Sequence, residues 1–354
     1  MDYQSLFTPF NYKTLSLKNR IVMPAMTRKR SPYGIPTSDV KDYYTRRATD
    51  SGLIISEGTV VERPASKNFR DIPNFYGAAL NSWSDIINSV HQQGGAMAPQ
   101  LWHVGITKPD PSGWLPPAPM EGPATMGLED IQGVIQSFAM AAVHAKNLGF
   151  DSIELHGAHG YLIDQFFWEK SNQRTDEYGG STLKERTRFA VDIIHAIREA
   201  VGPDLVIIMR LSQWKIQDYD ARLTLTPQEM DAWLVPMAEA GVDIFHCSQR
   251  RYWEPEFEGS DLNFAGWAKK ITGKPTITVG SIGLSGEFLQ TLYHGDGSER
   301  TDFTELIRRF DRGDFDLVAV GRSILQDPEW IKKIKEGRLH DIKDFSQDSL
   351  KSLY

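Results

Sequence analysis

The feature that most limits the fold of this chain is an alternation of short apolar runs with helical patterns, repeated eight times. The runs are rich in Ile, Val and Leu, as expected of strands that are buried on both faces of a parallel sheet. A helical pattern follows each run, and glycine or proline residues end several of these patterns. We expect strands at residues 20–26, 52–58, 96–103, 152–157, 205–212, 243–248, 275–280 and 317–322.

The connecting helices are most clearly bounded in four places. We expect helices over residues 81–93, 128–148 and 182–201, and a fourth that begins at Thr226 and Pro227. Threonine is a favoured N-cap residue, and proline is favoured in the first helical turn because it lacks an N–H that would go unsatisfied there. The connections therefore predict helices that cross over between parallel strands.

Eight strand–helix units without an intervening linker indicate an α/β fold with a single (β/α)8 TIM barrel over residues 1–354. The residues before position 20 are typical of a short β-hairpin, which we expect to close the N-terminal end of the barrel. A doubly wound sheet is the alternative. It usually carries a nucleotide-binding G-x-G-x-x-G after a strand, and this sequence has none.

Composition excludes several classes of protein. The net charge of −7 gives no surplus of basic residues for nucleic acid, and no apolar run reaches the roughly 20 residues that span a bilayer. The first ten residues contain no apolar core of a secretory signal. A single cysteine, Cys247, cannot form an internal disulfide or a cysteine-based metal cluster, and we interpret it as a small buried residue. We therefore expect a cytoplasmic protein without membrane or nucleic-acid partners.

Polar residues crowd the end of the fourth predicted strand. His156, His159 and Tyr161 lie within six positions of one another in the stretch 152–180. Two imidazoles and a phenol at the end of a buried strand can hold a carbonyl oxygen and deliver a proton. On spacing alone, one structural histidine, one histidine without a specific role and a core tyrosine are an equally good interpretation.

The other predicted strand ends are also polar, and active sites of such barrels lie at the C-terminal ends of the strands. Glycines at 280 and 321 let the backbone approach a ligand closely, and Arg322 offers a charged fork, which predicts a phosphate site. A turn glycine followed by a surface arginine is an equally good interpretation of 321–322. Arg210 follows a buried apolar run, so its charge needs a partner, and a bound anion would supply one.

Motifs spread from residue 5 to about residue 338 carry a resemblance to a known family. They are LFTPF, LKNRIVMPAMTR, YYTRRA, GLIISEGT, QLWHVG, HGAHGYLIDQFF, SNQRTDEYGGS and VGRSILQDPEWIKKIKEG. In these segments the chain resembles the Old Yellow Enzyme family, which are flavin mononucleotide (FMN)-dependent ene-reductases. The resemblance covers nearly the whole chain, and HGAHGYLIDQFF with SNQRTDEYGGS is its most specific part.

The resemblance implies non-covalent FMN and assigns residues to it. Thr27 matches a donor to flavin O4, and Gln100 matches the side chain on the pyrimidine edge. Arg210 matches the charge beside N1 and O2, where it would stabilise the reduced ring. The full implied set is Ala25, Met26, Thr27, Gly58, Gln100 and Arg210 at the ring, with Gly280, Ser281, Gly321 and Arg322 at the phosphate.

The resemblance also implies the reaction. NADH or NADPH would reduce the flavin and then leave. An activated alkene, which is an α,β-unsaturated carbonyl or nitro compound, would then bind where the nicotinamide had been. His156 and His159 would donate to the substrate oxygen, with Trp102 as a bulky residue over the substrate. Hydride would pass from flavin N5 to the β-carbon, and Tyr161 would protonate the α-carbon.

This sequence departs from the family in three places. The family's commoner pair is His and Asn, whereas His159 is the second member here. The sequences of the loops 106–126 and 249–263 differ from those usual in the family, and we expect both loops to border the pocket. Trp114, Tyr252 and Trp253 are their candidate pocket walls, and packed aromatics in surface loops are an equally good interpretation.

A metal-dependent hydrolase on the same barrel is the main alternative function. His103, His156, His159 and His246 could bind Zn²⁺ together with Glu57. However, no H-x-H opens the first strand, and Arg210 and Arg322 suit an anion better than a cation. We therefore predict no metal site.

Overall fold

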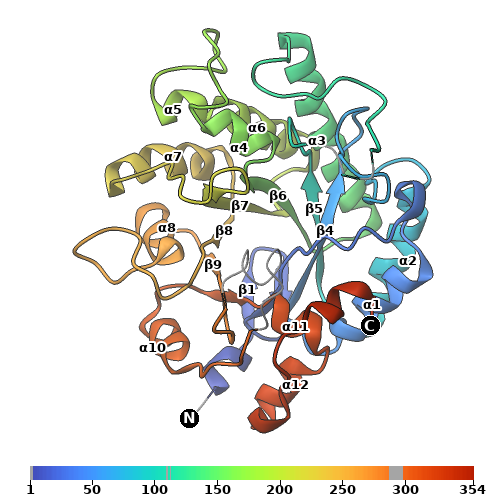
Figure 1. Ribbon diagram of the computed structural model, residues 1–354, viewed down its shortest axis with the longest axis vertical. Coiled ribbons are helices and arrows are strands. Elements are labelled where there is room, and N and C mark those ends of the chain that lie inside the picture. The colour runs from blue at the N-terminus through green and yellow to red at the C-terminus, as the bar shows by residue number, and fades with distance from the viewer. Residues whose placement is uncertain (1–2, 109–110, 112, 287–297) are drawn as a thin grey trace.

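The computed structural model describes residues 3–108, 111, 113–286 and 298–354, and it contains a closed barrel of parallel strands (Figure 1). The strand order around the barrel is β10-β3-β4-β5-β6-β7-β8-β9, so every strand pairs with its neighbours in sequence and the last pairs with the first. The predicted barrel is confirmed. Its strands are β3 (Ile21–Met23), β4 (Leu53–Val60), β5 (Met97–Trp102), β6 (Ser152–His159), β7 (Val206–Lys215), β8 (Ile244–Ser248), β9 (Thr276–Val279) and β10 (Leu317–Ala319).

Helices surround the barrel on its outside (Figure 1). In the described part of the chain, no helix combines the length and the apolar character that a bilayer-spanning segment needs. The α-helices are α1 (Ser38–Ala48), α2 (Ala79–Gln92), α3 (Leu128–Leu148), α4 (Leu162–Phe167), α5 (Leu183–Arg186), α6 (Arg188–Val201), α7 (Pro227–Ala240), α8 (Phe264–Thr272), α10 (Thr304–Arg312), α11 (Arg322–Gln326) and α12 (Trp330–Lys335). Short 3₁₀ helices are η1 (Gln4–Phe7), η2 (Pro32–Gly34), η3 (Leu339–Asp341) and η4 (Gln347–Lys351).

The helix boundaries follow local capping chemistry. Thr226 caps α7 by accepting a hydrogen bond from the Glu229 N–H, as its sequence position predicts. The single helix predicted over 182–201 is wrong in one respect, since the structure has two helices divided at Thr187. The Thr187 hydroxyl donates to the Leu183 carbonyl oxygen at 2.8 Å, and such bonding competes with the backbone ladder of a helix.

An antiparallel hairpin, β1 (Phe10–Tyr12) and β2 (Leu15–Leu17), precedes the barrel as predicted. Its buried side chains join the apolar interior formed by the first residues of several barrel strands. These residues lie at the N-terminal ends of the strands, so the hairpin closes that end of the barrel. The cluster contains Phe10, Leu15, Leu17, Leu53, Ala96, Val206 and Leu317 among others.

The barrel interior becomes polar toward the C-terminal ends of the strands. Gln100, Glu154, Arg210 and His246 come from β5, β6, β7 and β8 and are all buried. Gln100 pairs in register with Glu154, and Arg210 pairs in register with His246. We call these four residues the polar layer. Buried polar groups need partners, so this layer marks where the barrel stops being a simple apolar core.

Candidate active site

The predicted substrate residues meet at the end of β6. The His156 and His159 ring centroids are 5.2 Å apart and nearly perpendicular, and Tyr161 lies 5.0 Å from His156. Trp102, at the end of β5, makes an edge contact with Tyr161 at 4.8 Å. The structure therefore brings all four residues into one cluster.

A left-handed turn aims Tyr161 at this cluster. His159 has a φ of 64° and Gly160 a φ of 81°, so two successive residues reverse the direction in which the strand was running. Tyr161 then occupies the N-cap position of α4. In a straight strand His156 would face away from His159 and Tyr161. The register shift between Gly157 and His159, followed by this turn, explains how all three share one site.

A buried ion pair holds this turn, and the sequence did not predict it. Lys215 Nζ lies 2.8 Å from Asp164 Oδ1, and both side chains are fully buried. Asp164 also accepts the Gly160 N–H at 2.7 Å. Lys215 ends β7 and pairs in register with His159, so the ion pair fastens the turn to the neighbouring strand.

His159 makes two further contacts that sequence analysis missed. Its ring stacks on Trp214 with centroids 4.4 Å apart, and its Nε2 lies 2.8 Å from Ser248 Oγ. Trp214 and Ser248 lie on β7 and β8, far from residue 159 in sequence. Only the predicted order of the strands could have pointed to them.

Burial sets the protonation of both histidines. It lowers the pKa of His156 and of His159 well below the ordinary value, and the charge of Arg210 lowers both further. Each ring is therefore neutral at pH 7 and carries a single N–H donor. In the described structure the His156 Nδ1 atom is buried without a hydrogen-bond partner. Such an atom is available to a bound polar group.

The residues predicted to bind the cofactor ring come from four other strand ends. Arg210 Nη1 donates to the Ala25 carbonyl oxygen at 3.3 Å, which joins β7 to the segment after β3. Gly58 pairs in register with Gln100, and a Cβ atom at Gly58 would lie 2.4 Å from the Trp102 ring. Glycine is required there because the indole covers it. Met26 is half-buried, and Thr27 is exposed at this end of the barrel.

The predicted phosphate residues are also brought together. Arg322 is buried and donates through Nη2 to Ser281 Oγ at 3.1 Å, which connects the loops after β9 and β10. Gly280 has a φ of 152°, and a Cβ atom there would lie 2.4 Å from the Gln249 carbonyl oxygen. At Gly321 a Cβ atom would meet only ordinary contacts, the nearest being Met26 Sδ at 3.4 Å. Close backbone approach thus explains Gly280, whereas at Gly321 a Cβ atom would make only ordinary contacts with Met26 and Pro24.

The donors at this end of the barrel fit an anionic, planar, polar group. Arg210 is buried, and in the described residues its Nε atom has no partner. The nearby carboxylate of Glu154 supplies an opposite charge, which the sequence-based argument for a bound anion had overlooked. With the pair of Ser281 and Arg322, the site offers donors at both ends of a flavin nucleotide.

The two unusual loops differ in what they contribute. Glu121, in the loop 106–126, accepts from His103 at 2.7 Å and forms an ion pair with Arg63. These two partners lower the pKa of Glu121 to about 2, although burial opposes them. Trp114 in the same loop is half-buried. The loop is thus anchored to the ends of β4 and β5.

The loop 249–263 borders a pocket of about 280 Å³ that lies behind Trp214 and Ser248, and none of the predicted site residues lines it. Its walls include Trp214 and Ser248, which both contact His159, together with Arg250 and Glu256. Tyr252 and Trp253, the expected walls, instead pack on each other at 5.1 Å and do not line it. Burial and the charge of Glu305 on α10 together raise the pKa of Tyr252 to about 12, which places Tyr252 against that helix.

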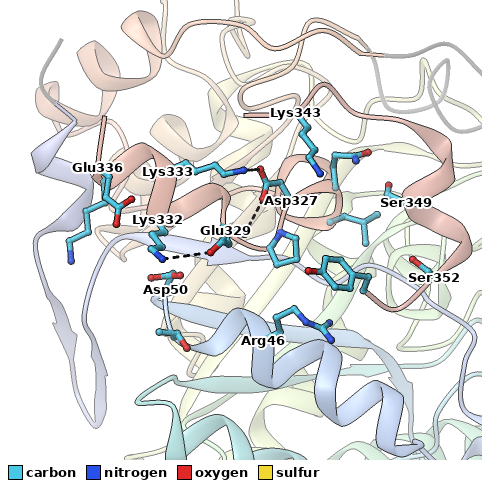
Figure 2. A pocket seen from close by; sticks show the side chains of 16 residues that line it. Arg46, Asp50, Asp327, Glu329, Lys332, Lys333, Glu336, Lys343, Ser349 and Ser352 are labelled. Carbon is cyan, nitrogen blue, oxygen red and sulfur yellow. Dashed lines mark hydrogen bonds and ion pairs between the residues drawn. The ribbon is translucent and has the colours of Figure 1, made fainter. Parts of the chain in front are cut away.

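A second and larger hollow lies away from this cluster. A groove between α1, α12 and the final segment of the chain has a volume of about 1040 Å³. Figure 2 shows Arg46, Asp50 and Lys332 on its walls. None of the predicted site residues lines it. It is therefore separate from the candidate active site.

The remaining candidates from the sequence have other surroundings. The described residues contain no group of three or more His, Cys, Asp or Glu side chains arranged to hold a metal ion. His103 is paired with Glu121, and His246 is paired with Glu154. Cys247 is buried, and burial raises the pKa of its thiol well above the ordinary value, which makes it unreactive.

Comparison with known proteins identifies the family. Residues 5–341 match the model of the NADH:flavin oxidoreductase / NADH oxidase family. The chain belongs to this family. The Old Yellow Enzyme resemblance is thereby confirmed, and the protein is an Old Yellow Enzyme-like oxidoreductase. Nothing in the comparisons supports the metal-dependent hydrolase.

Individual relatives agree with this assignment. The chain is 36% identical to an NADH oxidase of Thermoanaerobacter brockii over 96% of its own length, but it spans about half (52%) of that enzyme. It is 31% identical to 12-oxophytodienoate reductase 7 of Oryza sativa subsp. japonica, covering 93% of this chain and 87% of the relative. A solved structure of morphinone reductase in complex with tetrahydroNAD matches with a TM-score of 0.78 at 26% identity, over 98% of this chain and 93% of that one.

Proposed function

We propose that this protein binds FMN non-covalently, accepts hydride from NADH or NADPH, and reduces the activated C=C bond of an α,β-unsaturated carbonyl or nitro compound. The observation that carries the proposal is the cluster of His156, His159, Tyr161 and Trp102 at one barrel mouth. Family membership and the likeness to morphinone reductase support it.

The donors described above would hold the cofactor. Gln100 and Arg210 would bind the pyrimidine side of the ring, with Gly58 and the segment Ala25, Met26 and Thr27 around it. Gly280, Ser281, Gly321 and Arg322 would hold the phosphate. Bound FMN would supply the hydride chemistry, and the protein would orient the substrate and manage the proton.

The chain's own residues would then polarise the substrate. His156 and His159 are neutral donors, so together they can bind one oxygen without adding a full positive charge. Their hydrogen bonds would draw electron density from the β-carbon. Tyr161 would deliver the proton to the α-carbon, because a phenol with an ordinary pKa near 10 is protonated at neutral pH and suits a basic enolate.

The pocket behind Trp214 and Ser248, which both contact His159, would take the remainder of the substrate. Its walls combine the aromatic rings of Trp214 and Tyr219 with the polar groups of Ser248 and Arg250. A volume of about 280 Å³ is at the small end of ligand pockets, which favours compact enones over large ones.

An absorption spectrum of the purified protein tests the cofactor first. We expect flavin bands that bleach with NADPH under nitrogen and return when 2-cyclohexenone is added. A colourless protein that cannot be reconstituted with FMN would contradict the proposal. A yellow protein that bleaches with NADPH but is not reoxidised by the enone would support the assignment of FMN and contradict the assignment of the substrate.

Replacement of Tyr161 tests the proton donor. In Tyr161→Phe we expect flavin reduction by NADPH to stay within about twofold, while alkene reduction slows by about 100-fold, as loss of a general acid predicts. Stopped-flow measurement of the two half-reactions separates the effects. Tyr178→Phe is the control, since the Tyr178 hydroxyl bonds Asp192 and Gln132 away from this cluster. Equal slowing of both half-reactions in Tyr161→Phe would remove Tyr161 from this role.

A further inference from the structure

The centre of the polar layer is Glu154, a fully buried carboxylate on β6. Its Oε1 atom accepts a hydrogen bond from Gln100 Nε2 at 2.7 Å, and its Oε2 atom lies 2.6 Å from His246 Nδ1. One side chain therefore connects three barrel strands, and Gln100, which it holds, is one of the residues that would contact the flavin. Nothing in the sequence motifs explains a carboxylate at this depth.

The first consequence concerns the orientation of Gln100. A carboxylate can only accept hydrogen bonds, so the amide nitrogen of Gln100 must face Glu154. This leaves the amide oxygen, Oε1, as the acceptor on the other side. An acceptor is what the imide N–H of a flavin pyrimidine requires, and Glu154 thereby selects which end of Gln100 the cofactor meets.

The second consequence concerns charge. Arg210 is buried, and the pKa of its guanidinium is lowered by burial and raised by the negative charge of Glu154. Burial lowers the pKa of His246, so the imidazole beside Glu154 is neutral and does not cancel its charge. Glu154 thus offsets part of the positive charge that Arg210 presents, and water screens buried charges only weakly.

We propose that Glu154 is a positioning residue that fixes the amide of Gln100 and moderates the charge of Arg210, and thereby sets both the affinity and the reduction potential of the bound flavin. This inference rests on the proposed function, because Gln100 and Arg210 are its proposed flavin ligands. Positive charge beside the pyrimidine favours the reduced, anionic ring. Removal of the opposing carboxylate should therefore make the flavin easier to reduce.

Two substitutions separate charge from position. In Glu154→Gln the new side chain can still accept from Gln100 through its amide oxygen. Its amide nitrogen can donate to His246 Nδ1 once the proton of that neutral imidazole moves to Nε2, so both contacts can be kept while the charge is lost. We expect the equilibrium constant for flavin reduction to rise at least tenfold, about 30 mV for a two-electron couple. In Glu154→Asp the charge remains but the reach to Gln100 is shorter. We expect the FMN dissociation constant to rise at least tenfold while the reduction constant stays within threefold.

Both constants are measured on wild type and variants, by titration with FMN and by equilibration with a reference dye. Glu121→Gln is the matched control, since it removes a carboxylate held by His103 and Arg63 instead of one that acts on Arg210. It should leave the reduction constant within threefold.

Either of two results would overturn the inference: an unchanged potential in Glu154→Gln, or equal shifts in Glu154→Gln and Glu154→Asp. If Glu154→Gln does not fold, the separate effects of Glu154→Asp on affinity and potential still decide it. A wild-type protein that binds no FMN would overturn the proposed function itself, which this test distinguishes by measuring the wild type first.

Discussion

At the scale of single residues, His159 is held by its backbone as much as by its chemistry. Its φ of 64° lies in the left-handed region, where His and Asn are enriched among non-glycine residues. The family's commoner residue at this position is Asn, and this chain has His. Both donate hydrogen bonds, and both tolerate the turn. The backbone conformation at position 159 therefore limits which residue types can occur there, independently of their role in substrate binding.

A pair of substitutions at His159 tests this backbone limit. His159→Asn and His159→Val both lose the stack on Trp214, but only Val adds a β-branched side chain at positive φ. We expect His159→Val to be less stable than His159→Asn by about 1–2 kcal/mol, as left-handed strain predicts. Urea unfolding at 25 °C measures the difference. Equal stability of the two variants would show that the turn carries no such strain.

Glu57 gives the protein a pH dependence with a defined sign. Burial raises the pKa of Glu57 to about 7 from an ordinary 4.5, although it accepts the Arg28 N–H at 2.8 Å. Between these pH values the folded state keeps a proton that the unfolded state releases, so stability falls as pH rises. Glu57→Gln has no such proton to lose. As pH rises from 4.5 to 7, we therefore expect its free energy of unfolding to increase by about 3 kcal/mol relative to that of the wild type. Urea unfolding at both pH values tests this, and parallel behaviour of the two proteins would contradict it.

Single residues also show where sequence analysis stops. His156, His159 and Tyr161 could be found because they are neighbours in sequence and follow a recognisable strand. Lys215 could not, because its partner Asp164 lies on α4 and the two meet only where β6 and β7 lie side by side in the barrel. Glu154 escaped notice since one acidic residue inside an apolar run has no readable partner.

At the scale of elements, the strands were located correctly but their ends were not. The run 205–212 ends where the sequence turns polar, yet β7 continues to Lys215. Gln213 and Lys215 can be buried because Glu256 and Asp164 receive their hydrogen bonds. A polar residue marks the end of a strand only when it has no buried hydrogen-bond partner. Partners on other elements cannot be predicted from the sequence of the strand alone.

The final segment, residues 349–354, is held against the barrel by arginines of the β3–α1 region. Arg28 Nη2 donates to the carbonyl oxygens of Ser349, Leu350 and Ser352, and Arg47 Nη2 donates to Tyr354 O at 2.7 Å. Figure 1 shows the end of the chain beside α1, and Figure 2 shows Ser349 and Ser352 on the walls of the groove that Arg46 also lines. Arg28 follows Thr27 directly, so this segment is bonded to the residue next to a proposed flavin ligand.

Truncation after residue 348 should therefore destabilise the protein. It leaves the guanidinium groups of Arg28 and Arg47 without these acceptors, and we expect a loss of about 2–4 kcal/mol in the free energy of unfolding. Denaturant unfolding measures the loss. Lys351→Ala is the control, since that side chain forms only an exposed pair with Asp348 and should change stability by less than about 0.5 kcal/mol. A truncated chain as stable as the full chain would show that water replaces the carbonyl groups without cost.

At the scale of the whole molecule, the two ends of the barrel have different tasks. The hairpin and the first residues of the strands form an apolar plug, and the polar layer and the strand ends form the site. The sequence predicts this division. The repeated strand–helix pattern predicts the barrel, and in such a barrel the C-terminal ends of the strands meet at one end, where the site lies. It does not predict the loops 106–126 and 249–263, whose positions depend on contacts such as Glu121 with His103 and Arg63 rather than on periodicity.

This division makes a last prediction about Leu17, which is buried in the plug. Leu17→Ala leaves a cavity at the N-terminal end, and we expect a loss of about 2–4 kcal/mol in the free energy of unfolding. Ser16→Ala, on the exposed face of the same strand, should cost less than about 0.5 kcal/mol. We propose that residues 1–354 form one domain, so the loss should appear as a shift of one cooperative transition. FMN affinity should stay within threefold of wild type, because the plug and the site lie at opposite ends. Weakened FMN binding in Leu17→Ala would show instead that the barrel transmits strain along its full length.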